Sequence, residues 1–234
     1  MKLLHVAGAA LMSACLLIGQ TSRSSMTNTG KGALIGGGGG AGLGAGLGAL
    51  IGGGKGAGIG AAIGAAVGAG AGTLIGNKMD KQKKELEAQL AEQAKVEEVK
   101  DNNGLQAIKV TFDGGILFPL NGTSLSANAK KDLTGFANNL INNPGTDVTV
   151  LGFTDNTGTY AVNERVATGR ADAVMTYLVN SGVKPTRIQA EGLPMQDYVA
   201  SNDTSEGRAQ NRRVEIYITA SKEMIQQAES GTLK

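Results

Sequence analysis

The sequence predicts an α+β fold. We expect a C-terminal domain with the element order β-β-α-β-α-β-β and helices over one face of its sheet, preceded by a glycine-rich helical hairpin and a charged linker helix. Three observations support this prediction. Short apolar or alternating runs recur between residues 105 and 220, two longer segments there carry apolar residues at helical spacing, and glycine recurs at every fourth position upstream.

Residues 1–22 are expected to be a targeting signal. Lys2 precedes an apolar run from residue 3 to 18, which is short for a bilayer span and typical of a secretory signal. The stretch Leu-Met-Ser-Ala-Cys that ends at Cys15 resembles a bacterial lipoprotein cleavage box, so Cys15 is the lipidation candidate. The alternative is that Cys15 is only an apolar residue of the signal core. Because Cys15 is the single cysteine, the chain cannot form an intrachain disulfide.

Residues 30–77 carry a regular glycine pattern. Glycine occupies every fourth position from Gly32 to Gly76, and the residues between are mostly Ala, Leu, Ile and Val. Such spacing lets two helices approach closely, and in a membrane the need to pair backbone groups favours a helix. We expect a membrane-embedded or self-associating hairpin, which resembles the glycine-zipper regions of bacterial envelope proteins. The alternative is a flexible Gly-Ala linker, which the strict spacing disfavours.

Residues 78–100 are densely charged, with basic and acidic residues in equal number. Leu86, Leu90 and Ala94 form a narrow apolar stripe at four-residue spacing, and Asn77 is a candidate N-cap. We expect a solvated helix that acts as a stalk, with a short coiled coil as the lesser alternative.

Residues 105–220 are long enough to bury one hydrophobic core. Runs bounded by turn residues predict strands, and helical spacing after capping residues predicts helices. The expected strands cover 107–112, 116–118, 147–153, 187–192 and 214–218, and the expected helices cover 126–142 and 160–180. In the last strand, alternation turns Glu215 and Tyr217 away from the core. Residues 221–234 are expected to form a C-terminal tail.

The composition excludes several classes of function. A net charge of +2 is too small to indicate nucleic-acid binding, and aromatic residues make up only 3% of the chain. The single histidine, His5, lies in the predicted signal, so the mature chain lacks the imidazole that Ser-His-Asp, Cys-His and the common zinc sites require. We therefore expect no catalytic residue, no metal and no cofactor.

The most informative pattern is Phe153-Thr-Asp-Asn-Thr-Gly158 followed by Arg170. It places Asp155 and Arg170 on either side of a predicted strand-to-helix turn. Such a pair suits a small zwitterion, whose cation would meet Asp155 and whose carboxylate would meet the planar guanidinium of Arg170. Two structural alternatives stay open, namely an Asx-turn at Asp155 and a helix-surface ion pair at Arg170.

Residues 108–218 resemble the OmpA-like, peptidoglycan-associating domains. The resemblance rests on the ordered motifs Phe118-Pro-Leu-Asn121, Gly152–Gly158, Asn163-Glu-Arg165, Arg170-Ala171 and Asn211-Arg-Arg-Val214. It implies that Asp155 and Arg170 clamp the diaminopimelate of the peptidoglycan stem peptide. It also implies that Asn121 and Asn163 line the same pocket, that Thr154 and Asn156 lie near it, and that Arg208, Asn211 and Arg212 shape its rim.

Two of these roles have structural alternatives. Asn163 is equally explained as a residue of the first turn of a helix. The Arg212-Arg213 pair is equally explained as a solvated edge before a strand.

With its glycine-rich segment, the whole chain resembles the YiaD-type envelope lipoproteins. We therefore expect a non-enzymatic protein of the outer membrane that binds peptidoglycan with a periplasmic C-terminal domain and so tethers the membrane to the wall. The expected partners are peptidoglycan, outer-membrane lipid and, through the zipper, further copies of the chain. One alternative is an oligomeric membrane assembly or pore factor that its OmpA-like domain anchors to the wall. Another is a peptidoglycan hydrolase.

Overall fold

A computed structural model of the chain describes residues 67–234, except residue 102 and residues 120–121. The predicted signal at 1–22 with Cys15, most of the predicted zipper and the predicted pocket residue Asn121 lie outside the described residues. Their predicted roles stay predictions.

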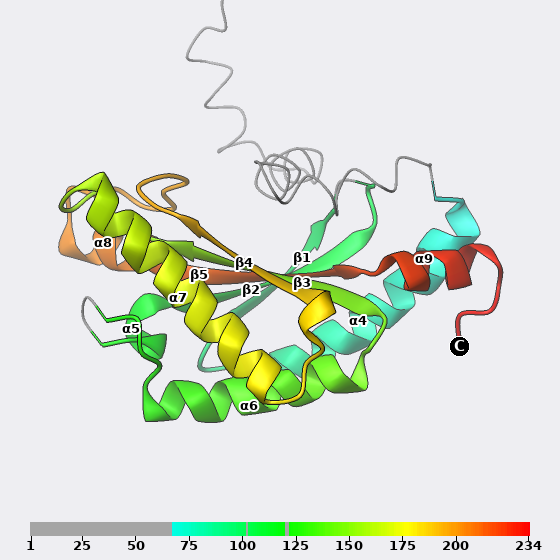
Figure 1. Cartoon of the computed structure of the whole chain (residues 1–234). Helices are drawn as coiled ribbons and strands as arrows, with labels where there is room; N and C mark the ends of the chain where they lie inside the picture. Colours follow the sequence, from blue (N-terminus) through cyan, green and yellow to red (C-terminus); the bar gives the residue numbers. More distant parts are fainter. Residues whose placement is uncertain (1–66, 102, 120–121) are drawn as a thin grey trace, which may run out of the picture. The chain divides into compact units, whose positions relative to one another are not determined.

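The described residues form one mixed sheet with helices packed against it (Figure 1). Element labels are those of Figure 1. In chain order the elements are α4 (Ala69–Leu90), β1 (Lys95–Lys100), β2 (Gln106–Asp113), α5 (Gly114–Leu117), α6 (Ala127–Asn142), β3 (Thr146–Phe153), α7 (Tyr160–Asn180), the short 3₁₀ helix η1 (Pro185–Arg187), β4 (Ile188–Leu193), α8 (Ser205–Asn211), β5 (Arg213–Ala220) and α9 (Lys222–Glu229).

The sheet has the strand order β1-β2-β5-β3-β4. All neighbouring strands run antiparallel except β3 and β4, which are parallel and joined through α7. The last strand in the sequence, β5, therefore lies at the centre of the sheet. The predicted α+β class with a single helix-covered sheet face is confirmed.

One face of the sheet carries the helices and the main hydrophobic core. Alternate residues of β2, β3 and β5 pack there against apolar residues of α4, α6 and α7. At its centre the rings of Phe112 and Phe136 meet edge to face, with centroids 6.4 Å apart. The opposite sheet face holds a smaller buried cluster that includes Leu151, Phe153 and Tyr217.

The two predicted helices of the domain form as expected because their start signals are local. The Ser126 hydroxyl accepts a hydrogen bond from Ala129 N at the start of α6, and the Thr159 hydroxyl accepts one from Val162 N at the start of α7. The predicted strand at 116–118 is wrong: Gly114–Leu117 is the short helix α5. Gly114 and Gly115 directly follow β2, and there the chain begins a short helix in place of the tight turn of a hairpin.

The predicted stalk helix at 78–100 is also wrong. Helix α4 begins at Ala69, within the predicted zipper, and ends at Leu90, whereas Lys95–Lys100 form the edge strand β1. Neither a solvated stalk nor a coiled coil fits α4, because one side of it is buried in the domain core. Its buried apolar residues are Ala71, Ile75, Met79, Leu86 and Leu90.

A polar contact fixes α4 to α6 beside this apolar side. Gln82 Nε2 donates to Asn139 Oδ1 at 3.0 Å, and Asn139 Nδ2 donates to Glu85 Oε2 at 3.2 Å. Residues 221–234, expected to be a tail, contain α9, which packs against α4 through buried Met224 and Ile225. Among the helices of the described part, none is long and apolar enough to cross a membrane.

Candidate ligand-binding site

Asp155 lies in the turn that follows β3 and is 5% exposed. Its Oδ1 accepts a hydrogen bond from Thr157 N at 2.8 Å, and its Oδ2 accepts one from Arg212 Nη1 at 2.6 Å. The first bond is the Asx-turn that the sequence left open as an alternative. The second is an ion pair across 57 residues of sequence, so the carboxylate also has a role beyond its own turn.

These contacts keep the Asp155 carboxylate charged. Burial is the largest influence and by itself would raise the pKa of Asp155, but the hydrogen bonds from Thr157 and Arg212 outweigh it and hold the pKa below the ordinary value. The phenol of Tyr198 lies within the field of this carboxylate. Burial and then the charge of Asp155 raise the pKa of Tyr198.

Arg170 lies on α7 and is 3% exposed, so the alternative of a helix-surface ion pair is wrong. Its Nε donates to Gly122 O at 3.1 Å, and its guanidinium carbon lies 5.3 Å from the centre of the Phe118 ring. Its Nη1 is buried and has no hydrogen-bond partner among the described residues. A buried guanidinium nitrogen without an acceptor is rare in folded proteins and marks a place where an acceptor is missing.

The charges around Arg170 explain how it stays unpaired. Burial and the nearby charge of Arg212 lower the pKa of Arg170, while the charge of Asp155 raises it. Arg212 takes Asp155 Oδ2, and the ion pairs of the described residues include none between Asp155 and Arg170. Two cations and one carboxylate therefore meet at this site, which leaves one positive charge available to an anion.

A close approach of the backbone shapes the wall beside Arg170. Gly114 N donates to Arg212 O at 2.7 Å, and the Cβ of any side chain at Gly114 would overlap with that oxygen and lie 3.4 Å from Arg170 Nη1. Only glycine fits there without displacing the Arg212 backbone. The start of α5 thus closes one side of the site.

The other predicted pocket residues near the Asp155 turn hold its shape. The Thr154 hydroxyl accepts from Met195 N at 3.1 Å, and Asn163 Nδ2 donates to the carbonyls of Thr157 and Thr159 at 2.8 and 3.1 Å. Thr154 and Asn163 are buried, whereas Asn156 is exposed. For Asn163 the structure thus supplies the helix-start role that the sequence left open. Ligand contact by Thr154, Asn156 and Asn163 stays a prediction.

The predicted rim residues mainly fasten the segment that follows β4. Arg208 Nη1 donates to Asn202 O at 2.7 Å. Asn211 is fully buried and makes hydrogen bonds to Val199, Ala200 and Asn202. Arg212 alone among the three reaches the carboxylate of Asp155.

Sequence reasoning missed the buried network next to this motif. Arg213 is 4% exposed and lies at the start of the central strand, so the alternative of a solvated edge is wrong for it. Its Nε donates to Glu215 Oε1 at 2.8 Å, and Tyr217 OH donates to Glu215 Oε2 at 2.7 Å. The strand period of two puts these three residues on one face, a signal that was present in the sequence.

The arrangement is suited to binding a charged ligand. Arg170 Nη1 can donate to an anionic oxygen, and Asp155 presents a charged carboxylate to a cation. In the described part of the chain, no cluster of His, Cys, Asp and Glu side chains is arranged to hold a metal ion. The site can therefore hold a ligand that carries both signs of charge.

Two segments of the chain match models of known protein families. Residues 117–212 match the model of the OmpA family, and residues 39–83 match that of the glycine zipper. Over 112 residues the chain is 39% identical to the probable lipoprotein YiaD of Escherichia coli, a match that covers 48% of this chain and 51% of that protein. It is 41% identical over 112 residues to the peptidoglycan-binding protein ArfA of Mycobacterium tuberculosis, with 48% of this chain and 34% of that protein covered.

A solved structure agrees with the sequence relatives. The cell wall anchor of the T6SS from Pseudomonas aeruginosa superimposes with a TM-score of 0.51 at 30% identity, which covers 58% of this chain and 97% of that one. The chain spans about half the length of YiaD and about a third of the length of ArfA. Residues 117–212 are thus similar to OmpA-family domains, and residues 39–83 are similar to glycine zippers.

Proposed function

We propose that this chain binds peptidoglycan noncovalently and tethers the outer membrane to the cell wall without catalysing a reaction. The single observation that carries the proposal is the buried Arg170 Nη1, which has no acceptor among the described residues and lies in the field of Asp155. An unpaired buried charge is costly, so its presence is best explained by a ligand that supplies the missing anion.

Diaminopimelate of the stem peptide fits the chemistry of this site. Its amino-acid centre carries an ammonium and a carboxylate, which match Asp155 and Arg170 respectively. Arginine suits the carboxylate because its planar donors form two parallel hydrogen bonds, a geometry that lysine cannot offer. The low exposure of both side chains strengthens such contacts by excluding water.

The relatives support the same assignment. ArfA is by name a peptidoglycan-binding protein, and the P. aeruginosa structure is described as a cell wall anchor. YiaD is by name a probable lipoprotein, which agrees with lipidation at Cys15. The domain would then face the periplasm, and the zipper would insert into the membrane or join copies of the chain.

Sedimentation of the full chain with purified peptidoglycan tests the site. We expect Asp155→Asn and Arg170→Lys each to weaken binding at least about 30-fold, because breaking one buried charged contact costs about 2–5 kcal/mol. Asp172→Asn and Arg165→Lys, at exposed positions of α7, are the matched controls and should bind as the unaltered protein does. Circular dichroism checks that each variant is folded. Undiminished binding by both site variants would disprove the assignment.

The pore or assembly alternative depends on the zipper. Cross-linking of the full chain in membranes separates it from a simple tether, since a tether requires nothing larger than a dimer. Ladders of higher oligomers that persist in Arg170→Lys would favour the assembly factor.

A further inference from the structure

A site for a ligand that carries both charges places opposite charges of the protein near each other. Asp155 and Arg170 are buried, and the charge of Asp155 acts on Arg170. Opposite charges attract strongly where water is largely excluded, and an ion pair between these two would use up the contacts that a ligand needs. In the described part of the chain, however, Asp155 pairs with Arg212, and Arg170 Nη1 has no partner. The protein thus holds the two opposite charges apart.

Two hydrogen bonds fix the Asp155 carboxylate. Its Oδ1 accepts from Thr157 N at 2.8 Å, and its Oδ2 accepts from Arg212 Nη1 at 2.6 Å. A carboxylate can accept about four hydrogen bonds, so these two leave room for the ammonium of a ligand. Without the Arg212 side chain, Oδ2 would keep no hydrogen bond to the described residues. Arg212 therefore decides whether this oxygen is occupied in the free protein.

Arg170 is held only at one end of its guanidinium group. Its Nε donates to Gly122 O at 3.1 Å, and its guanidinium carbon lies over the Phe118 ring. Its Nη1 is buried and unpaired among the described residues. An unpaired buried donor is costly, so it takes an acceptor that comes within reach. If Arg212 released Asp155, the free Oδ2 would be such an acceptor.

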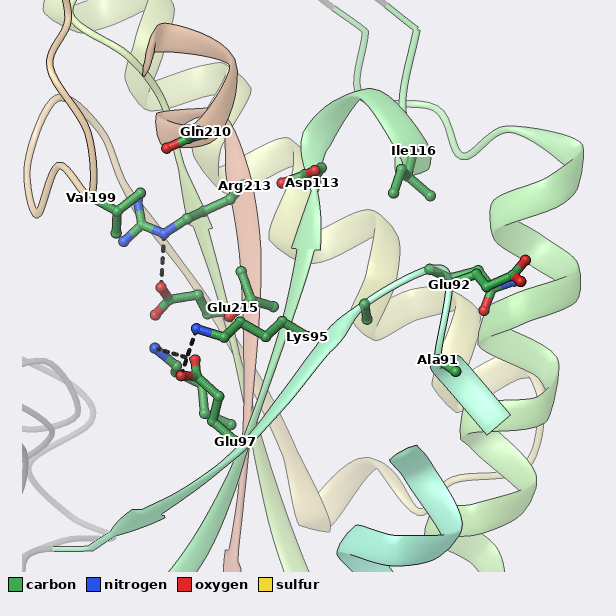
Figure 2. Close-up of a pocket in the computed structure, with 14 residues that line it drawn as sticks. Ala91, Glu92, Lys95, Glu97, Asp113, Ile116, Val199, Gln210, Arg213 and Glu215 are labelled. Atoms are coloured by element: carbon green, nitrogen blue, oxygen red, sulfur yellow. Dashed lines mark hydrogen bonds and ion pairs between the residues drawn. The ribbon is translucent and has the colours of Figure 1, made fainter. Parts of the chain in front are cut away.

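Arg212 lies nearer to the solvent than the carboxylate that it contacts. Its side chain is 30% exposed, whereas that of Asp155 is 8% exposed. Its backbone oxygen accepts from Gly114 N at 2.7 Å, which fixes the position from which the side chain reaches the site. Arg213, the next residue, cannot replace it, because Arg213 lines a cavity on the opposite face of the sheet and donates to Glu215 there (Figure 2).

We infer that Arg212 is a positioning residue, which holds Asp155 Oδ2 so that Asp155 cannot pair with Arg170 and the site stays open for its ligand. Arg212 also neutralises much of the charge of Asp155, which weakens the attraction between Asp155 and Arg170. The inference rests on the proposed function for the identity of the ligand. The contact that keeps the two charges apart exists without a ligand and can be tested without one.

Urea unfolding of the full chain tests whether Arg212 keeps the pair apart. Asp155→Asn and Arg170→Met are made singly and together, first in the unaltered protein and then in an Arg212→Met background. In the unaltered protein their effects on the folding equilibrium constant should multiply to within about twofold, because the two side chains are not bonded to each other. In the Arg212→Met background the measured double effect should differ from the product by at least about fivefold, because either substitution then breaks the same new ion pair.

Sedimentation with purified peptidoglycan tests the consequence for binding. Arg212→Met should weaken binding at least about tenfold, because the ligand must first break the new pair between Asp155 and Arg170. Arg212→Lys keeps a cation beside Asp155 and should restore most of the binding. Arg165→Met, at an exposed position of α7, is the matched control and should bind as the unaltered protein does.

Three results would overturn the inference and leave the proposed function standing. They are normal binding by Arg212→Met, no coupling between Asp155 and Arg170 in that background, and an equal loss of binding in Arg212→Met and Arg212→Lys. If Asp155→Asn and Arg170→Lys bound peptidoglycan normally, the proposed function would be wrong. The unfolding measurement would still decide the role of Arg212, since coupling in the Arg212→Met background would support it.

Discussion

Arg170 and Arg213 are both buried, with 3% and 4% of their surface exposed, but they differ in the partners of their guanidinium groups. Arg213 donates to Glu215 at 2.8 Å and to Asp197 O at 2.9 Å, and its guanidinium lies 3.8 Å from the centre of the Phe153 ring. Arg170 has the Gly122 carbonyl and the Phe118 ring, but no carboxylate bonds to it within the described residues.

The difference separates a structural arginine, Arg213, from the arginine that we propose to bind the ligand, Arg170. Arg213 joins the central strand to the segment after β4, and Glu215 neutralises its charge inside the protein. Arg170 is held in position by weak contacts and keeps a donor free. Burial therefore does not distinguish the two roles, whereas the count of satisfied donors does. The same substitution at both positions tests this contrast directly.

Arg213→Met should have the largest effect on stability. It leaves Glu215 buried with Tyr217 as its remaining partner, and the loss of one member of a buried ion pair costs about 3–5 kcal/mol. Urea unfolding of the full chain, followed by circular dichroism, measures the loss. Arg165→Met, at an exposed position of α7, is the matched control. A loss below about 1 kcal/mol would mean that the Arg213–Glu215 pair does not support the sheet.

Asp155→Asn should have an intermediate effect on stability. Asp155 is a charged neighbour of Arg170, but its ion pair is with Arg212. The substitution weakens the charge-assisted hydrogen bond from Arg212, for which we expect a loss of about 1–2 kcal/mol near neutral pH. The pKa of Asp155 is lowered in the folded state, so this contribution is fully present above the unfolded pKa of about 3.9 and disappears as the pH falls through the folded pKa.

Unfolding curves of the two proteins across the acid range check this dependence. The unaltered protein and Asp155→Asn should differ in stability at pH 7 and converge at the acid end. A difference that does not change with pH would show that the carboxylate is not charged in the folded protein.

Arg170→Met should change stability by no more than about 1 kcal/mol, since a single hydrogen bond to Gly122 is lost while an unsatisfied buried nitrogen is removed. Binding to peptidoglycan should nevertheless be lost. This combination is the reverse of the result expected at Arg213. If Arg170→Met destabilised the protein as much as Arg213→Met, Arg170 would be a structural residue and the proposed site would be wrong.

Local signals explain which parts of the fold could be predicted from the sequence. Helix α7 begins and ends as predicted, at Tyr160 and Asn180, because its cap and its apolar spacing lie within the segment itself. Helix α4 and strand β1 were mispredicted because their burial depends on distant partners. Lys95–Lys100 do not alternate cleanly in polarity and become a strand only by pairing with β2. In the sequence, the apolar residues of α4 form only a narrow stripe. Their burial depends on the packing of α6 and α9 against α4.

The candidate site also contains residues that a local pattern predicts and contacts that depend on distant parts of the chain. The spacing of Asp155 and Arg170 around a strand-to-helix turn identified two of the three charged residues that meet there. The contact of Arg212 with Asp155 spans 57 residues and depends on β5 lying beside β3, which no local pattern reveals. The unpaired donor of Arg170 also depends on Gly114 and on the Arg212 backbone, which close the wall beside it.

Asp197→Gly should have the smallest effect, and it should be stabilising. Asp197 has a φ of 52° in the segment that Arg213 holds, a conformation that glycine adopts more readily than other residues. Its side chain is exposed, and its backbone oxygen still accepts from Arg213 after substitution. We expect a gain of about 0.5 kcal/mol, since relief of strain is partly offset by the greater freedom of glycine in the unfolded chain. Gln196→Gly is the control, because Gln196 has no positive φ, and it should lower the stability of the protein. If Asp197→Gly lowered the stability by a similar amount, the backbone at Asp197 would not be strained.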